Sequence, residues 1–143
     1  MAKTVTTFLG AAFLLVGLLG FAVPGFLGAH LTPAHNVIHL VSGALALYFG
    51  LSGTLPAARL FAIVFGSVYG LLGFLGFIVG RTGASPLHGM DSRILEIIPG
   101  VLVLGTTDHL IHIVLGVVFL LSGLLTKPKS YPEVTQPHTS IPR

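Results

Sequence analysis

Two pairs of polar residues stand out because each pair is spaced by one helical turn within an otherwise apolar stretch. His35 precedes His39 by four positions, and Asp108 precedes His112 by four. Side chains at this spacing share one face of a helix. Imidazoles and a carboxylate gathered in this way could bind a metal ion, hold a haem or chlorophyll, pass protons, or hydrogen-bond to neighbouring loops.

The interpretation we prefer for these residues is structural. Polar groups within an apolar bundle must find partners whether or not they do chemistry, so we expect a polar cap at one end of the helices. Its members would be Asn36, His39, Asp108 and His112. A proton relay is less favoured, because nothing ionisable lies deeper in the apolar segments.

The alternative interpretation is a ligand site on the same faces. His39 and His112 would be the axial ligands of a haem or a chlorophyll. A divalent metal site would instead draw on the candidate ligands His35, His39, Asp108, His109 and His112.

The composition limits the class of protein. Of the 143 residues, 53% are hydrophobic and only 8% are charged, and the mean hydropathy is +0.97. A soluble domain carries about 25% charged residues, so a soluble enzyme, a disordered tail and a nucleic-acid-binding module are all excluded. The chain has no cysteine, which excludes disulfides and thiolate sites. No nucleophile, carboxylate pair or phosphate loop is recognisable, and we expect no enzymatic activity.

Long uncharged stretches define the expected elements. No Lys, Arg, Asp or Glu lies between Lys3 and Arg59, between Arg59 and Arg81, or between Asp108 and Lys127. Because a helix needs about 20 apolar residues to cross a bilayer, the sequence predicts four transmembrane helices. They are expected at residues 6–23, 33–51, 56–79 and 107–125, with Thr32-Pro33 opening the second.

An internal repeat relates the two halves of the chain. The stretch His39–Gly43 aligns with His112–Gly116, and the glycines of the first helix align with those of the third. The sequence therefore predicts an all-α, four-helix transmembrane bundle of two helical hairpins in parallel repeat. Repeat 1 covers about residues 5–53 and repeat 2 about 56–125, within a domain of residues 1–126.

Glycines follow the same helix faces and predict close helix packing. We expect them to pack within the bundle; the alternative is an exposed face for a homo-oligomer or other membrane-protein subunits. The glycines concerned are Gly43, Gly50, Gly66, Gly70, Gly73, Gly76, Gly116 and Gly123.

Between the third and fourth helices we expect a short interfacial helix at Arg93–Ile98, and after Lys127 a polar, proline-rich tail over residues 127–143. Most basic residues lie on the side of the termini. The positive-inside rule therefore predicts that both termini are cytoplasmic, in a bacterial inner or thylakoid-type membrane.

The stretch His35–Gly43 resembles the signature HNxxHLxxG of a small bacterial family of four-helix membrane proteins of uncharacterised function. The likeness covers about residues 5–125. A second run opens the fourth helix at Asp108–Gly116, where His109 replaces the asparagine that the family typically has. The resemblance implies the fold and a membrane location, and it implies no activity.

Together these observations predict a non-catalytic small integral membrane protein, an accessory or structural subunit of a larger membrane complex. The alternative is a haem-, chlorophyll- or metal-binding subunit of a photosynthetic or respiratory complex that uses His39 and His112. The expected partners are the lipid bilayer and other membrane subunits. A channel or transporter is disfavoured, because the spans lack charges and broken helices.

Overall fold

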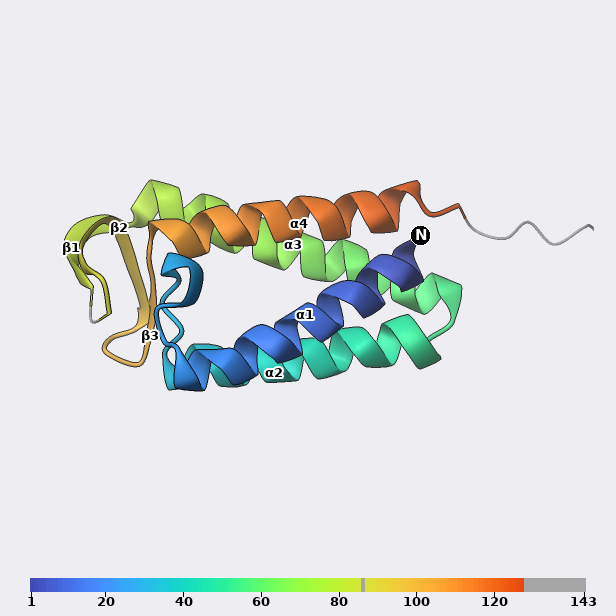
Figure 1. The fold of residues 1–143 in the computed structure, drawn as a ribbon. Helices are drawn as coiled ribbons and strands as arrows, with labels where there is room; N and C mark the ends of the chain where they lie inside the picture. Colours follow the sequence, from blue (N-terminus) through green and yellow to red (C-terminus); the bar gives the residue numbers. More distant parts are fainter. Residues whose placement is uncertain (86, 128–143) are drawn as a thin grey trace, which may run out of the picture.

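The computed structural model of the chain describes residues 1–85 and 87–127. In this part, four helices run side by side along the molecule (Figure 1), and each is long and apolar enough to cross a membrane. They are α1 (Ala2–Ala22), α2 (Pro33–Leu47, extended by a π-helical turn, η2, Tyr48–Ser52), α3 (Leu55–Val79) and α4 (Thr106–Leu125). These bounds lie within a few residues of the predicted ones at most ends.

Hydroxyl caps and prolines set where α2 and α3 begin. The Thr32 side chain accepts a hydrogen bond from the backbone N–H of His35, at 3.3 Å, and Pro33 is the first helical residue. Thr54 accepts from the N–H of Ala57 in the same way, at 3.4 Å. The caps supply partners for N–H groups that the helix itself leaves free.

Glycines let the two helices of each hairpin approach closely. A Cβ added to Gly43 on α2 would lie 2.8 Å from the carbonyl oxygen of Gly10 on α1. A Cβ added to Gly116 on α4 would lie 2.5 Å from the backbone of Gly70 on α3. All eight glycines singled out in the sequence face the other helix of their own hairpin. They therefore lie inside the bundle.

An aromatic core joins the two hairpins. Phe13 of α1, Tyr69 of α3 and Phe119 of α4 are buried together, and Phe65 packs against them. The Phe13 ring lies 5.2 Å from that of Tyr69 and 6.3 Å from that of Phe119, measured between centroids. Below the polar end of the helices, the centre of the bundle is thus filled by apolar rings.

A small antiparallel sheet covers one end of the bundle, between α3 and α4 (Figure 1). Within the described residues its strands are β1 (Arg81–Ser85), β2 (Gly89–Ile98) and β3 (Leu102–Leu104), in that order. The predictions of an all-α fold and of an interfacial helix at Arg93–Ile98 are therefore wrong for this segment. Gly89 and Gly100 adopt positive φ angles at the two turns, so the isoleucine-rich segment between them folds back to pair with both neighbours.

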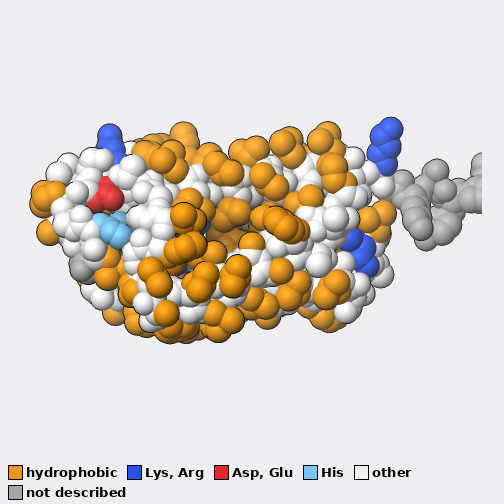
Figure 2. Space-filling model, in the orientation of Figure 1, with side chains coloured by type: hydrophobic (Ala, Val, Ile, Leu, Met, Phe, Trp, Pro, Cys, Tyr) orange, Lys and Arg blue, Asp and Glu red, His pale blue; other side chains and the backbone are white. Residues whose placement is uncertain are grey.

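The surface separates apolar from charged residues along the length of the molecule. Hydrophobic side chains cover the helices, and the Lys and Arg side chains in view lie at the two ends (Figure 2). Lys3 donates to the carbonyl oxygen of Gly53, at 2.8 Å, and Arg59 donates to that of Gly123, at 2.9 Å, where η2 and α4 end. This distribution is compatible with a membrane protein. Apart from Lys127, the predicted tail lies outside the described residues.

Candidate functional site

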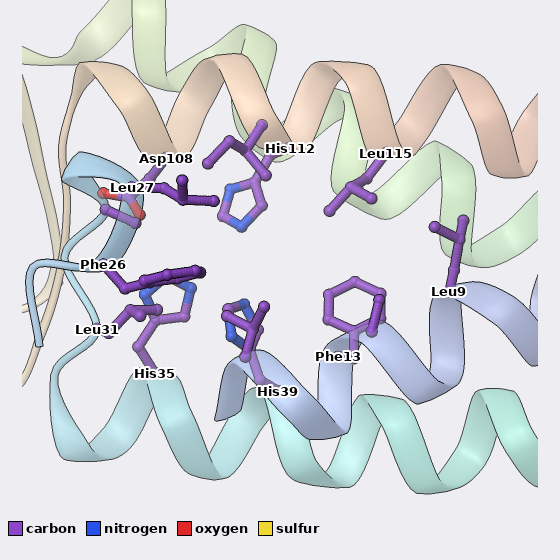
Figure 3. Close-up of a pocket in the computed structure, with 14 residues that line it drawn as sticks. Leu9, Phe13, Phe26, Leu27, Leu31, His35, His39, Asp108, His112 and Leu115 are labelled. Carbon is purple, nitrogen blue, oxygen red and sulfur yellow. The ribbon is translucent and has the colours of Figure 1, made fainter. Parts of the chain in front are cut away.

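Three imidazoles meet between the two hairpins, near the end covered by the sheet. His35 and His39 come from α2 and His112 comes from α4 (Figure 3). One nitrogen of each ring can be chosen so that the three lie within 4.8 Å of one another. All three side chains are buried, with exposed fractions of 3%, 7% and 3%. The structure thus brings together three of the five metal ligands proposed from the sequence.

The three rings border a cavity of about 140 Å³. Apart from the imidazoles and Asp108, its lining is apolar, with Phe13 on the side away from the sheet and Phe26 and Leu31 from the α1–α2 connection (Figure 3). Leu27 and Ala29 of the same connection and side chains of α1 and α4 form its remaining walls. The cavity therefore lies along the seam between the two hairpins.

A chain of hydrogen bonds fixes the orientation of His35. Its Nδ1 lies 2.8 Å from the carbonyl oxygen of His30. Because a carbonyl oxygen can only accept, Nδ1 carries the proton, and the lone pair of the neutral ring is on Nε2. The His30 ring in turn contacts the Asp108 carboxylate, with 2.8 Å between His30 Nδ1 and Asp108 Oδ2. His30 thus connects α4 to the histidines of α2.

Asp108 is surrounded by N–H donors. Its carboxylate accepts hydrogen bonds from the backbone N–H of His30, at 3.1 Å, and from that of Gly105, at 2.7 Å. The side chain is only 2% exposed. A carboxylate that only accepts hydrogen bonds is suited to its ionised form.

His39 and His112 are held by packing instead. Within residues 1–85 and 87–127, the buried Nδ1 of each has no hydrogen-bond partner. The His39 ring lies 5.3 Å from the Phe13 ring, and the His112 ring lies 5.2 Å from that of Tyr69. A buried polar atom left without a partner costs about 1–3 kcal/mol, and hydrogen bonds of a polar cap do not satisfy these two nitrogens; Thr6 Oγ1, Asn36 Oδ1 and His109 Nδ1 are buried without a described partner as well.

The other predicted polar residues lie beside the cluster and make bonds to the backbone. Asn36 donates from Nδ2 to the carbonyl oxygen of Leu31, at 3.2 Å. His109 faces α3 and the sheet, and its Nε2 lies 2.9 Å from the carbonyl oxygen of Arg93. Both residues tie a helix end to a connecting segment. His109 therefore does not join His35, His39 and His112.

Ser85, His30 and Asp108 form a second arrangement, which the sequence did not reveal. Ser85 Oγ contacts His30 Nε2, and His30 Nδ1 contacts Asp108, in the order found in serine hydrolases. However, Ser85 Oγ also accepts the backbone N–H groups of Leu87 and His88, each at 3.1 Å. Ser85 is buried and lines none of the described cavities, so the arrangement fits a structural link between β1 and the α1–α2 connection.

The chemistry open to the site follows from its donors. Imidazole nitrogens with free lone pairs, in a small apolar cavity beside a buried carboxylate, are suited to a cation. Comparison of the chain with protein-family models, with curated proteins and with solved structures found no match.

Proposed function

We propose that the chain is a small integral membrane protein with a non-catalytic role, as an accessory or structural subunit of a larger membrane complex. The observation that carries this proposal is the distribution of side chains. Large hydrophobic residues are exposed along all four helices, whereas the charged groups lie near the two ends. Such a surface is stable in contact with lipid, whereas in water it would leave a large apolar area exposed to solvent.

The interior of the bundle supports a role without catalysis. Glycines bring the helices of each hairpin into contact, and aromatic rings fill the space between the hairpins. Asn36, His109 and Asp108 bond to connecting segments and hold the helix ends in place. The resemblance of His35–Gly43 to the signature of a four-helix membrane family also predicts a membrane location, and it remains a prediction.

Extraction from the membrane tests the proposal. In a mild detergent we expect the chain to migrate on a native gel with a complex much larger than itself, and to separate from it in a stronger detergent. If it remains in the aqueous fraction without detergent, the membrane location is wrong. If it migrates alone in the mildest conditions, the role as a subunit is wrong.

Haem or chlorophyll on His39 and His112 is the less suitable of the ligands considered. Pockets for drug-sized and cofactor-sized ligands occupy about 300–1,000 Å³, whereas this cavity has about 140 Å³. In addition, one nitrogen of His35 lies within 4.8 Å of a nitrogen of each of these rings, where a macrocycle ligated by them would need room. We expect an absorption spectrum of the purified protein without a Soret band; such a band would favour the tetrapyrrole instead.

A further inference from the structure

We propose that His35, His39 and His112 together bind one transition metal ion of the zinc class, through three imidazole nitrogens. This site goes beyond the proposed structural role and does not depend on it. It is carried by the three buried rings around one cavity, each of which offers a nitrogen within 4.8 Å of the other two. The buried Nδ1 atoms of His39 and His112, like that of His109 outside the cluster, have no hydrogen-bond partner among the described residues.

The distances suit a single ion after small side-chain rotations. Nitrogens that share a tetrahedral zinc ion at about 2.1 Å are separated from one another by about 3.4 Å. In the structure the three chosen nitrogens lie within 4.8 Å of one another. Because the rings already face the same cavity (Figure 3), coordination requires rotation of side chains and no rearrangement of helices.

One of the three ligands, His35, is preoriented in the manner of known metal sites. A histidine that binds a metal commonly donates its other N–H to a carbonyl or carboxylate oxygen, which fixes the ring and its tautomer. His35 does so through the carbonyl oxygen of His30. His30 is itself held by Asp108, so the backbone that orients one ligand is tied to the helix that carries another.

The charge near the cluster favours a cation. Asp108 lines the same cavity and is buried among N–H donors. Of its described hydrogen-bond partners, only the His30 ring can take up a positive charge. A metal cation beside this carboxylate would offset a buried negative charge that is otherwise costly.

The site would leave room for a further ligand. The described cluster has three members, and apart from Asp108 the remaining cavity lining is apolar. Three histidines with an open position are typical of zinc sites that bind water or a small molecule. Because His112 belongs to one hairpin and His35 and His39 to the other, the ion would also join the two hairpins.

Zinc binding to the full chain in detergent tests the proposal. The protein is purified with an affinity tag that contains no histidine, treated with a chelator, dialysed against Zn²⁺ and analysed for metal content. We expect one tightly bound zinc ion per chain. We expect His39→Ala and His112→Ala each to weaken the affinity by more than about 100-fold, since removing a ligand costs more than removing a group behind it.

His88→Ala is the matched control. It removes an exposed imidazole that bonds to the carbonyl oxygen of Ala29 and packs against the His30 ring but is not one of the three ligands, so one zinc ion should remain bound. Cobalt provides a measurement that needs no variant: Co²⁺ in a four-coordinate nitrogen site gives intense visible absorption, and added Zn²⁺ should abolish it.

Absence of saturable Zn²⁺ binding in the wild type, or undiminished binding in folded His39→Ala and His112→Ala proteins, would overturn the proposal. Neither result bears on whether the chain is extracted with a larger complex.

Discussion

His30 has the most consequential position of any single residue near the cluster. Its ring contacts Asp108 on α4 and Ser85 on β1, and its carbonyl oxygen accepts a hydrogen bond from His35 on α2. One residue, only 1% exposed, therefore contacts three segments that are distant from one another in the sequence: its ring contacts two of them and its backbone the third. The geometry of the imidazoles depends on this link.

Asp108→Asn tests the link, with Asp108 as a positioning residue. An amide at this position loses the charge and turns one acceptor into a donor that faces the N–H groups of His30 and Gly105. We expect zinc affinity to fall by about 10–100-fold, the usual effect of changing a group behind a ligand. A competition titration with a chromophoric chelator measures it.

Glu96→Gln is the control for this change, because Glu96 is a carboxylate of the sheet that bonds to the N–H of Gly100 and lies outside the cluster. A purely structural role for Asp108 predicts lower stability with zinc affinity unchanged in the molecules that remain folded. That outcome would contradict the positioning role.

At the level of residues, sequence spacing predicted which side chains share a helix face and nothing about contacts between segments. The four-residue spacing placed His35 and His39 on one face, and the repeat placed His112 on the corresponding face of α4. The same reasoning grouped His109 with the ligands, although it faces α3 and the sheet. The roles of His30 and Ser85 depend on tertiary contacts of loops, for which no local pattern exists.

At the level of elements, Gly70 and Gly116 face each other where α3 and α4 cross, but the space around them differs. A Cβ at Gly116 would lie 2.5 Å from the Gly70 backbone, whereas a Cβ at Gly70 would lie 3.8 Å from the nearest atom, Gly116 Cα. We expect Gly116→Ala to destabilise the bundle by about 1–3 kcal/mol, because backbone must move. We expect Gly70→Ala to be nearly neutral.

Thermal unfolding in detergent, followed by circular dichroism, compares these two variants directly. They carry the same chemical change at facing positions, so each serves as the control for the other. Equal destabilisation by both, or none by Gly116→Ala, would show that this contact does not limit the approach of α3 and α4.

The sheet caps the fourth helix through Asp91. The carboxylate of Asp91 accepts hydrogen bonds from the backbone N–H of Thr106, at 3.0 Å, and from its hydroxyl group, where α4 begins. Partial burial raises the pKa of Asp91, but the hydrogen bonds from Thr106 and Arg93 outweigh it and hold the pKa below its ordinary value. The ionised form is therefore favoured in the folded protein.

Because folding lowers this pKa, the stabilisation by Asp91 is present above the pKa of the unfolded chain and is lost as the pH falls through the folded value. We expect Asp91→Asn to lower stability at neutral pH by about 1 kcal/mol, as loss of a helix cap does. The difference from the wild type should shrink on acidification below pH about 4. Unfolding curves across this range measure it, and a constant difference would exclude the ionic contribution.

The helices could be predicted from the sequence and the sheet could not, for a physical reason. Uncharged stretches of helical length specify the spans almost alone. The segment at Arg93–Ile98 is short and apolar in a way that suits either a helix or a buried strand. Its conformation as a strand is determined by pairing with two other segments, Arg81–Ser85 and Leu102–Leu104. The turns at Gly89 and Gly100 bring these segments alongside it.

At the level of the whole molecule, the two hairpins are packed alike and differ at one end. Gly10 meets Gly43 as Gly66 meets Gly116, and Lys3 and Arg59 both bond to carbonyl oxygens where a helix ends. The second hairpin alone carries the sheet, which lies over the polar end of both. The cavity lies in the seam between the hairpins, so a ligand bound there would contact both.

Orientation in the membrane is the prediction that belongs to this scale. The chain has no cysteine, so single cysteines can be introduced as labels. Ser52 and Ser92 are both exposed; Ser52 lies at the end where Lys3 and Arg59 bond to helix ends, and Ser92 lies in the sheet. Because the basic residues favour a cytoplasmic location for the first end, an impermeant maleimide on intact cells should label Ser92→Cys. It should label Ser52→Cys only after the membrane is opened. The reverse pattern would invert the topology, and equal labelling of both before opening would contradict a spanning bundle.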